Sequence, residues 1–396
     1  DVIRQHIFLN SGDVLDQDNL DQAKRNLFRL GLFSRVQFEA ADGNFDSSSE
    51  SLLIKVVERN MRALDVGIGG NSEYGVHLFG EYIDRAIFSD GRSLGSRIDS
   101  YYDRDVADVS KGIASIRYID PFFIGHNIRL TQDLRFQRSK SGVLPFDIDR
   151  IALSTFLDRE LNEETKISVG HTISREDLSD VEPDVILSPL DSGILRLSFL
   201  TATLALDRRD SAIIPRKGYF LGIDGKLSQQ FIASDANYFG AGAKFSFYLP
   251  LTTSPRFTIA NNTRFSGLVS QDGSDEIPIS QRLFLGGHDT VRGFKENSLG
   301  PKGENGNSIG GDTLFFNNFE FQYGIGENVL LASFLDVGTT FLHNRDFSIT
   351  DVRESAGVSI RYLSPIGSIG VDLGFPLDKR ADESNTRIHF NIGAQF

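Results

Sequence analysis

The last ten residues, Arg387-Ile388-His389-Phe390-Asn391-Ile392-Gly393-Ala394-Gln395-Phe396, place apolar side chains at every second position. Side chains alternate between the two faces of a β-strand, so this stretch predicts a strand with one apolar face and one polar face. From about Arg62 onward the sequence repeats this unit, with roughly ten alternating residues followed by a turn. Such strands suit a barrel that faces lipid outside and water inside.

The barrel region offers sixteen strand candidates, joined by connections that are short and long in turn. An even strand number with this alternation of loop length is typical of outer-membrane barrels. The sequence therefore predicts an all-β transmembrane barrel of about 16 antiparallel strands over residues 60–396. The candidates lie near residues 62–70, 74–84, 92–102, 111–119, 126–137, 149–159, 164–174, 192–207, 217–229, 237–249, 255–267, 312–324, 327–340, 354–363, 366–376 and 386–396.

Composition excludes several other classes of protein. The chain of 396 residues has a net charge of −13 and no cysteine. With no basic stripe we expect no nucleic-acid partner, and with no apolar run of about 18 residues we expect no transmembrane helix. The seven histidines are scattered without a metal-binding or catalytic spacing. We therefore expect no enzyme, catalytic residue, metal site or cofactor.

Residues 1–59 have a different pattern. Leu20, Ala23, Leu27 and Leu30 recur at helical spacing, which predicts a helix with Asp18 as its N-cap and Gly31 just after its end. Residues 2–9 read as an earlier helix, and apolar alternation near residues 36–38 and 52–56 predicts two strands. The sequence thus predicts a small α+β domain ahead of the barrel.

The longest connection, from about Val269 to Gly311, contains Gly286-Gly287-His288-Asp289-Thr290-Val291-Arg292-Gly293-Phe294. Beyond it, alternation turns the carboxylates Glu320 and Asp336 toward the lumen, because their neighbours along each strand are apolar. Guanidinium groups suit bidentate pairing with carboxylates. Arg292, Glu320 and Asp336 are therefore candidates for a functional cluster.

The loop sequence resembles the sixth-loop signature of the outer-membrane protein assembly superfamily, which has BamA-like and TamA-like branches. Phe334-Leu335-Asp336-Val337-Gly338 is similar to a strand motif of that family. The resemblance implies that the loop folds into the barrel and that Arg292 pairs with Asp336 and Glu320. The loop-lock motif it implies is Val291, Arg292, Gly293 and Phe294.

The N-terminal region, with its phrase Leu30-Gly31-Leu32-Phe33-Ser34, resembles a POTRA domain of the same family. A full POTRA domain has a strand before its two helices, so we expect this one to be truncated. The resemblance implies a periplasmic POTRA domain and a barrel in the bacterial outer membrane. Its implied partners are outer-membrane lipid, unfolded β-barrel clients, and periplasmic chaperones and accessory lipoproteins bound through the POTRA domains.

The implied activity is the folding and insertion of barrel proteins at a lateral seam between the first and last strands. Glycine weakens strand interiors, so we expect a short seam, although the same glycines also fit a role in barrel curvature. A BamA-like factor is favoured; a TamA-like factor, a two-partner secretion pore exporting an unfolded polypeptide, and a diffusion porin are the alternatives. The candidate seam residues are Ala63, Gly67, Gly69, Gly70, Ile388, Phe390, Ile392 and Phe396.

Overall fold

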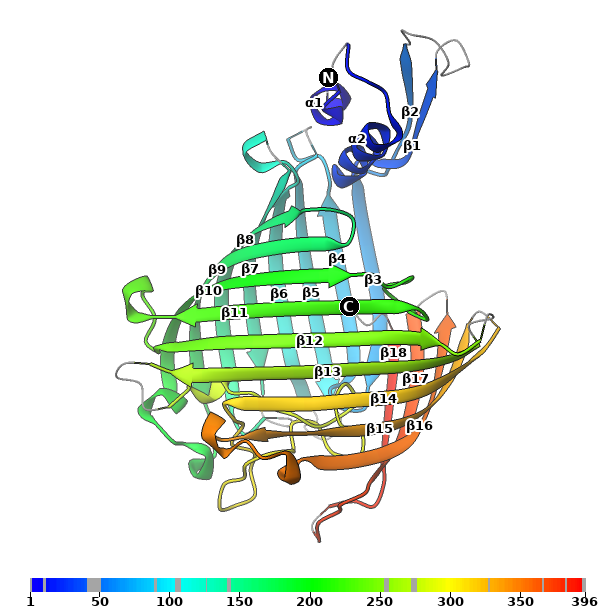
Figure 1. Ribbon diagram of the computed structural model, residues 1–396. Helices are drawn as coiled ribbons and strands as arrows, with labels where there is room; N and C mark the ends of the chain where they lie inside the picture. The colour runs from blue at the N-terminus through cyan, green and yellow to red at the C-terminus, as the bar shows by residue number, and fades with distance from the viewer. Residues whose placement is uncertain are drawn as a thin grey trace.

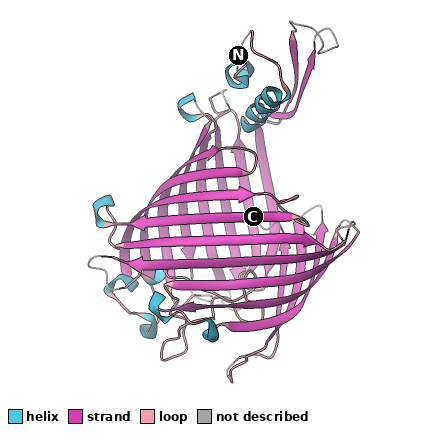
Figure 2. Cartoon of the chain, viewed as in Figure 1, coloured by secondary structure: helices cyan, strands magenta, loops and turns pink. Residues whose placement is uncertain are grey.

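Two units make up the described chain, a small N-terminal module and the closed β-barrel that follows it (Figure 1). Strands dominate, and the helices belong to the module and to connections between barrel strands (Figure 2). In the part of the chain that is described, no helix is long and apolar enough to cross a membrane. The computed structural model describes residues 2–9, 12–40, 51–88, 91–103, 108–125, 127–140, 144–252, 256–271, 276–326, 328–364, 367–381 and 383–393.

The module contains two helices, α1 (Val2–Ile7) and α2 (Gln17–Arg29), and an antiparallel pair of strands, β1 (Phe33–Ala40) and β2 (Leu52–Glu58). The expected N-cap is wrong by two residues. Asp16 has the extended backbone of a cap, and its Oδ1 accepts a hydrogen bond of 2.7 Å from the Asn19 amide. Asp18 lies inside the first turn, where its charge still favours the helix N-terminus.

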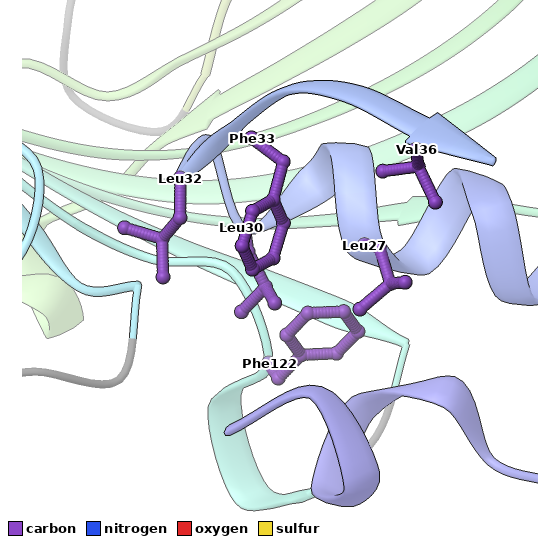
Figure 3. Close-up of a cluster of buried hydrophobic side chains, with 6 residues drawn as sticks. All are labelled: Leu27, Leu30, Leu32, Phe33, Val36 and Phe122. Carbon is purple, nitrogen blue, oxygen red and sulfur yellow. The ribbon is translucent and has the colours of Figure 1, made fainter. Parts of the chain in front are cut away.

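An apolar cluster joins the module to the barrel (Figure 3). Phe122, in the turn after barrel strand β6 (Asp108–Asp120), is buried among side chains of α2, β1 and the connection between them. Ion pairs also join the two units: Arg25 pairs with Glu163 in the turn after β8 (Asp147–Glu160), and Arg29 pairs with Glu160 at the end of that strand. The Arg25–Glu163 pair is exposed at both ends, and pairs of that kind add little. Apolar burial and the half-buried Arg29–Glu160 pair therefore hold the module in place. The cluster comprises Leu27, Leu30, Leu32, Phe33, Val36 and Phe122.

The barrel closes with sixteen antiparallel strands, which confirms the predicted fold class. Each strand pairs with its neighbours in sequence, and the last strand returns to the first. The strands are β3 (Arg62–Asn71), β4 (Gly75–Asp84), β5 (Ser93–Asp103), β6 (Asp108–Asp120), β7 (Ile128–Ser139), β8 (Asp147–Glu160), β9 (Thr165–Ser179), β10 (Gly193–Asp207), β11 (Gly218–Ser228), β12 (Tyr238–Pro250), β13 (Phe257–Ser270), β14 (Thr313–Ile325), β15 (Val329–Phe341), β16 (Arg353–Ser364), β17 (Gly367–Pro376) and β18 (Arg387–Gly393).

Alternation along β18 separates the outer face of the wall from the inner face. Ile388, Phe390 and Ile392 are 63, 42 and 46% exposed, whereas His389 and Asn391 are buried at 1 and 8%. The outward side chains are apolar and available to lipid, and the inward ones are polar. Ala394, Gln395 and Phe396 lie outside the described residues.

Charged side chains line the lumen. The inward row of β7 borders a cavity of about 600 Å³. Asp133 of this row receives a hydrogen bond of 3.0 Å from Arg117 Nε on β6, and Arg150 on β8 lies 2.8 Å from Glu176 on β9. These groups would be costly in lipid, so their position fixes which face of the wall is inside. The β7 row consists of Arg129, Thr131, Asp133, Arg135 and Gln137.

Candidate functional site: the docked loop and the barrel seam

The connection between β13 and β14 folds back against the inner wall. We refer to its residues 276–312 as the docked loop. Bridges from Leu283 to Gly311 and from Leu285 to Leu299 hold the loop against itself. Its apolar side chains form a buried cluster with inward residues of β14, so the loop has a core of its own inside the barrel. That cluster comprises Leu285, Val291, Phe294, Leu299, Leu314 and Phe316.

Arg292 binds both carboxylates that the sequence singles out. Its Nε and Nη2 donate to the two oxygens of Asp336 on β15 at 2.8 and 2.7 Å. Its Nη1 donates to Glu320 Oε1 on β14 at 2.6 Å. The guanidinium also lies 3.5 Å from the ring centroid of Phe334, a favourable cation–π geometry. Arg292, Glu320 and Asp336 are called the lock below.

Two neighbouring strands add a second layer of charge around the lock. Arg361 on β16 donates to both oxygens of Glu320, at 3.1 and 2.6 Å. Asp372 on β17 lies 3.6 Å from Arg292 Nη1. The cluster thus sets two arginines against three carboxylates, and it ties the loop to four consecutive strands.

Because the lock is buried, removing any one of its charges is costly. Arg292, Glu320 and Asp336 are exposed by 4, 8 and 0%, and removing one member of a buried pair leaves the other charge without a partner. Burial lowers the pKa of Arg292, but hydrogen bonding and the charges of the carboxylates outweigh burial and raise its pKa above the usual value. The arginine is therefore a fixed positive charge.

Backbone groups of the motif also bind the wall. The Arg292 amide donates to Asp336 Oδ2 at 3.1 Å, and the Gly293 amide donates to Ser355 Oγ on β16 at 3.1 Å. Val291 and Phe294 are buried at 0 and 3%. All four residues of the predicted motif therefore contact or pack against the inner wall.

A second arginine, Arg282, anchors the part of the docked loop that precedes the lock motif. Arg282 Nη2 donates to Asp191 Oδ2 at 2.7 Å, and both side chains are fully buried. Asp191 belongs to the connection between β9 and β10, across the lumen from β14 and β15, which carry the carboxylates of the lock. The loop is thus held both by the lock and by the separate Arg282–Asp191 ion pair.

The seam between β18 and β3 is the other expected feature, and among the described residues it has two strand pairs, Asn391 with Asn71 and Ile392 with Gly70. Both lie where β3 approaches its turn into β4. The Ser72 amide adds one hydrogen bond of 3.1 Å to the Phe390 carbonyl. For comparison, β9 and β10 share fourteen pairs.

The exposure of outward side chains on β3 agrees with the small number of described seam pairs. The outward apolar residues of β3 before the seam pairs are more exposed than the other described apolar residues of the barrel strands, at 73, 76 and 71% for Leu64, Val66 and Ile68. Outward residues of well-paired strands, such as Val169 and Phe245, are 50 and 42% exposed. The first part of β3 therefore presents an edge that no described residue of β18 covers.

The predicted seam residues separate into two groups. Gly70 and Ile392 pair across the seam, and Phe390 reaches it through its carbonyl. Ala63, Gly67 and Gly69 pair with β4, and Ile388 pairs with β17. Phe396 lies outside the described residues. At Gly67, a β-carbon would stand 2.3 Å from the ring of Phe79, so this glycine makes room for an aromatic side chain on β4.

Sequence reasoning missed Arg361, Asp372 and His389. Each lies on the inward face of its strand, so alternation contains the signal for all three. What alternation lacks is position along the barrel axis, because that depends on strand stagger. The described residues hold no cluster of three or more potential metal ligands.

Comparison with known proteins identifies relatives of the whole chain. Residues 71–396 match the family model of the Omp85 superfamily domain. The outer membrane protein assembly factor BamA of Nitratidesulfovibrio vulgaris is 24% identical over all of this chain and 49% of its own length. The chain thus spans about half the length of that relative.

Solved structures show the same fold. The crystal structure of BamA from Haemophilus ducreyi lacking POTRA domains 1–3 aligns over all of this chain and 81% of its own, with a TM-score of 0.81 and 21% identity. CdiB from Escherichia coli aligns over all of this chain and 74% of its own, with a TM-score of 0.67 and 13% identity.

Proposed function

This chain belongs to the Omp85 superfamily, and from that premise we propose that it folds and inserts β-barrel proteins through the seam between β3 and β18. The barrel is an outer-membrane barrel, and its superfamily acts in outer-membrane protein assembly or secretion. Members of the family are assembly and transport factors rather than enzymes. The BamA-like activity proposed here is the more specific step.

The seam is the observation that carries the proposal. An edge strand presents unpaired amide and carbonyl groups, which bind another strand by β-augmentation. The edge of β3 from residue 62 to residue 69 has no described partner on β18. A client strand that pairs there satisfies its backbone while its apolar face enters lipid, so the reaction needs no nucleotide.

The docked loop supplies rigidity beside that edge. It joins β14, β15, β16 and β17 through one buried cluster of charges. We assign the lock an architectural role, in which it keeps one side of the barrel fixed while the seam changes its pairing. Val291, Arg292, Gly293 and Phe294 serve as the loop's contact with the wall.

Residues 1–59 are proposed to belong to a POTRA domain that lies in the periplasm. Two helices followed by an antiparallel pair of strands support this assignment. The alignment with the Haemophilus ducreyi structure extends over these residues. On this assignment, unfolded clients, chaperones and accessory lipoproteins approach the barrel from the module's side, and the docked loop enters from the opposite side.

A disulfide across the seam tests the proposal. Gly70 and Ile392 face each other, and the chain contains no other cysteine, so Gly70→Cys with Ile392→Cys creates one defined cross-link. In liposomes, the oxidised protein should stop inserting an unfolded barrel client, and reduction should restore insertion. Gly70→Cys alone is the control. Undiminished insertion with the disulfide fully formed would refute a seam mechanism.

A secretion pore is the second candidate, favoured by the water-accessible lumen cavity of about 600 Å³. Export of an unfolded chain requires a path through the lumen rather than an open wall. The same cross-linked protein separates the two functions. A secretion pore would keep exporting its substrate with the seam closed, whereas an insertase would lose its activity.

A further inference from the structure

His389 occupies a position that the proposed function leaves unexplained. It projects from the inner face of β18, opposite Asp372 on β17, and is 1% exposed. It stands two residues before the first seam pair, Asn391 with Asn71. A buried polar side chain therefore lies directly beside the seam.

The two ring nitrogens of His389 bind different parts of the molecule. Nε2 lies 2.8 Å from the carbonyl oxygen of Arg292 in the docked loop, and Nδ1 lies 2.6 Å from Glu73 Oε1 in the turn between β3 and β4. A carbonyl accepts and never donates, so Nε2 carries a proton. A further proton lies between Nδ1 and the carboxylate, which makes this contact charge-assisted.

The surroundings favour that arrangement. Burial raises the pKa of Glu73, but the hydrogen bond and charge of His389, together with a hydrogen bond from Ser72 and the charge of Arg387, hold the pKa below its usual value. Gly374 on β17 lets the loop approach, because a β-carbon there would stand 2.5 Å from the Arg292 carbonyl oxygen. The wall is therefore shaped to bring the loop backbone to His389.

We propose that His389 is a positioning residue that connects the docked loop to the turn of the β3–β4 hairpin. Through this connection it holds the seam closed where β3 turns into β4. This inference rests on the proposed role of the seam. We call the two contacts of His389 the link. They connect the Arg292 carbonyl of the docked loop, through β18, to Glu73 on the other side of the seam. Release of the loop removes one end of this link, so loop docking and seam closure are coupled.

The link lies at one end of the seam. The described seam pairs and the Glu73 contact lie together where β3 turns into β4. Loss of the link therefore weakens the end of the seam at which described residues pair.

Spin labels on the two strands measure the link directly. Ile68→Cys and Ile392→Cys place labels on outward, exposed positions of β3 and β18, and pulsed electron paramagnetic resonance gives their distance distribution for the full chain in lipid nanodiscs. His389→Ala and Glu73→Ala should each raise the open-to-closed ratio about tenfold, the effect expected from loss of one charge-assisted hydrogen bond. Glu73→Gln keeps a hydrogen-bonding side chain without the charge, so it should raise the ratio less than Glu73→Ala does.

A matched histidine on another wall is the control. His171 on β9 contacts Ser198 Oγ at 2.8 Å, away from both the lock and the seam strands. His171→Ala should leave the distance distribution unchanged. If the His389 variant fails to fold, the comparison of Glu73→Ala with Glu73→Gln still decides the question. Equal seam distances in those two variants would overturn the proposal.

Coupling is tested by combining substitutions. Arg292→Ala should open the seam, and in the His389→Ala background it should add little, because the link is already broken. Fully additive effects would refute the coupling. The distance measurement needs no client, so it fails independently of the proposed function: variants that open the seam without changing insertion contradict the insertase, not the link.

Discussion

The lock and the seam lie close together on the barrel wall, yet they are built in opposite ways. At the lock, buried charged residues make short hydrogen bonds to one another. At the seam, the described strands share two pairs, against seven between β17 and β18 and ten between β3 and β4. Buried side chains thus hold the wall tightly next to the joint that has the fewest strand pairs among the described residues.

This difference shows how a closed barrel can keep one joint available. Between the other neighbouring strands, a backbone ladder of seven or more described pairs secures the wall. Near the seam, the contacts of Glu73, His389 and Arg292 supplement the few strand pairs. Side-chain contacts of this kind can be broken one at a time, whereas opening a full strand pair requires the loss of many hydrogen bonds together.

The largest effect should come from reversing the charge of the lock. Arg292→Glu places a carboxylate beside Glu320 and Asp336, so we expect undocking of the loop. Breaking a buried pair costs roughly 3–5 kcal/mol, which shifts the docked-to-undocked ratio by at least about 100-fold. Limited proteolysis of the loop and client insertion in liposomes measure the two consequences, and both should change strongly.

Asp191→Asn sharpens the comparison, because it weakens the loop's other anchor at Arg282 while it leaves the lock intact. Protease should then reach the part of the loop around Arg282, but client insertion should stay close to that of the parent protein. If Asp191→Asn and Arg292→Glu reduce insertion equally, loop order in general matters and the lock has no special role.

Much of this architecture follows from the sequence. Period-two alternation establishes the strand number and which face of β18 meets lipid, since Ile388 and His389 cannot exchange faces without a register slip. The same alternation turns Asp336 and Glu320 inward. Their meeting with Arg292 comes from the family resemblance, because no local pattern says that a loop folds into a lumen.

Contacts between distant segments were beyond the sequence. The Glu73–His389 pair depends on where the last strand meets the first, and barrel stagger sets that meeting point. The glycines of β3 carry a mixed signal: Gly70 pairs across the seam, whereas Gly67 accommodates Phe79. Helix capping was misplaced by two residues because Asp16 and Asp18 are both suitable caps, and backbone geometry selects between them.

A smaller effect should appear as a pH dependence of loop docking. Glu296 lies in the docked loop, where burial, followed by the charges of Glu73 and Asp289, raises its pKa from 4.5 to about 8. The undocked loop then loses this proton at lower pH than the docked loop does. Docking should be strongest below about pH 4.5, weaken as the pH rises, and level off above about pH 8.

Proteolysis of the loop across this pH range tests the expectation, with Glu296→Gln as the matched variant. The glutamine variant should show a flatter profile, because its side chain does not titrate. An unchanged slope in Glu296→Gln would assign the pH dependence to other groups near the seam.

Hydrogen exchange tests the central claim, that β3 presents an available edge, most directly. In the full chain in nanodiscs, the alternate amides of residues 62–69 that face the seam should exchange far faster than amides of β9. Adding a peptide with the alternating pattern of an outer-membrane strand should protect them. Protection of those amides equal to that of β9 without peptide, or no gain in protection when the peptide is bound, would contradict the account.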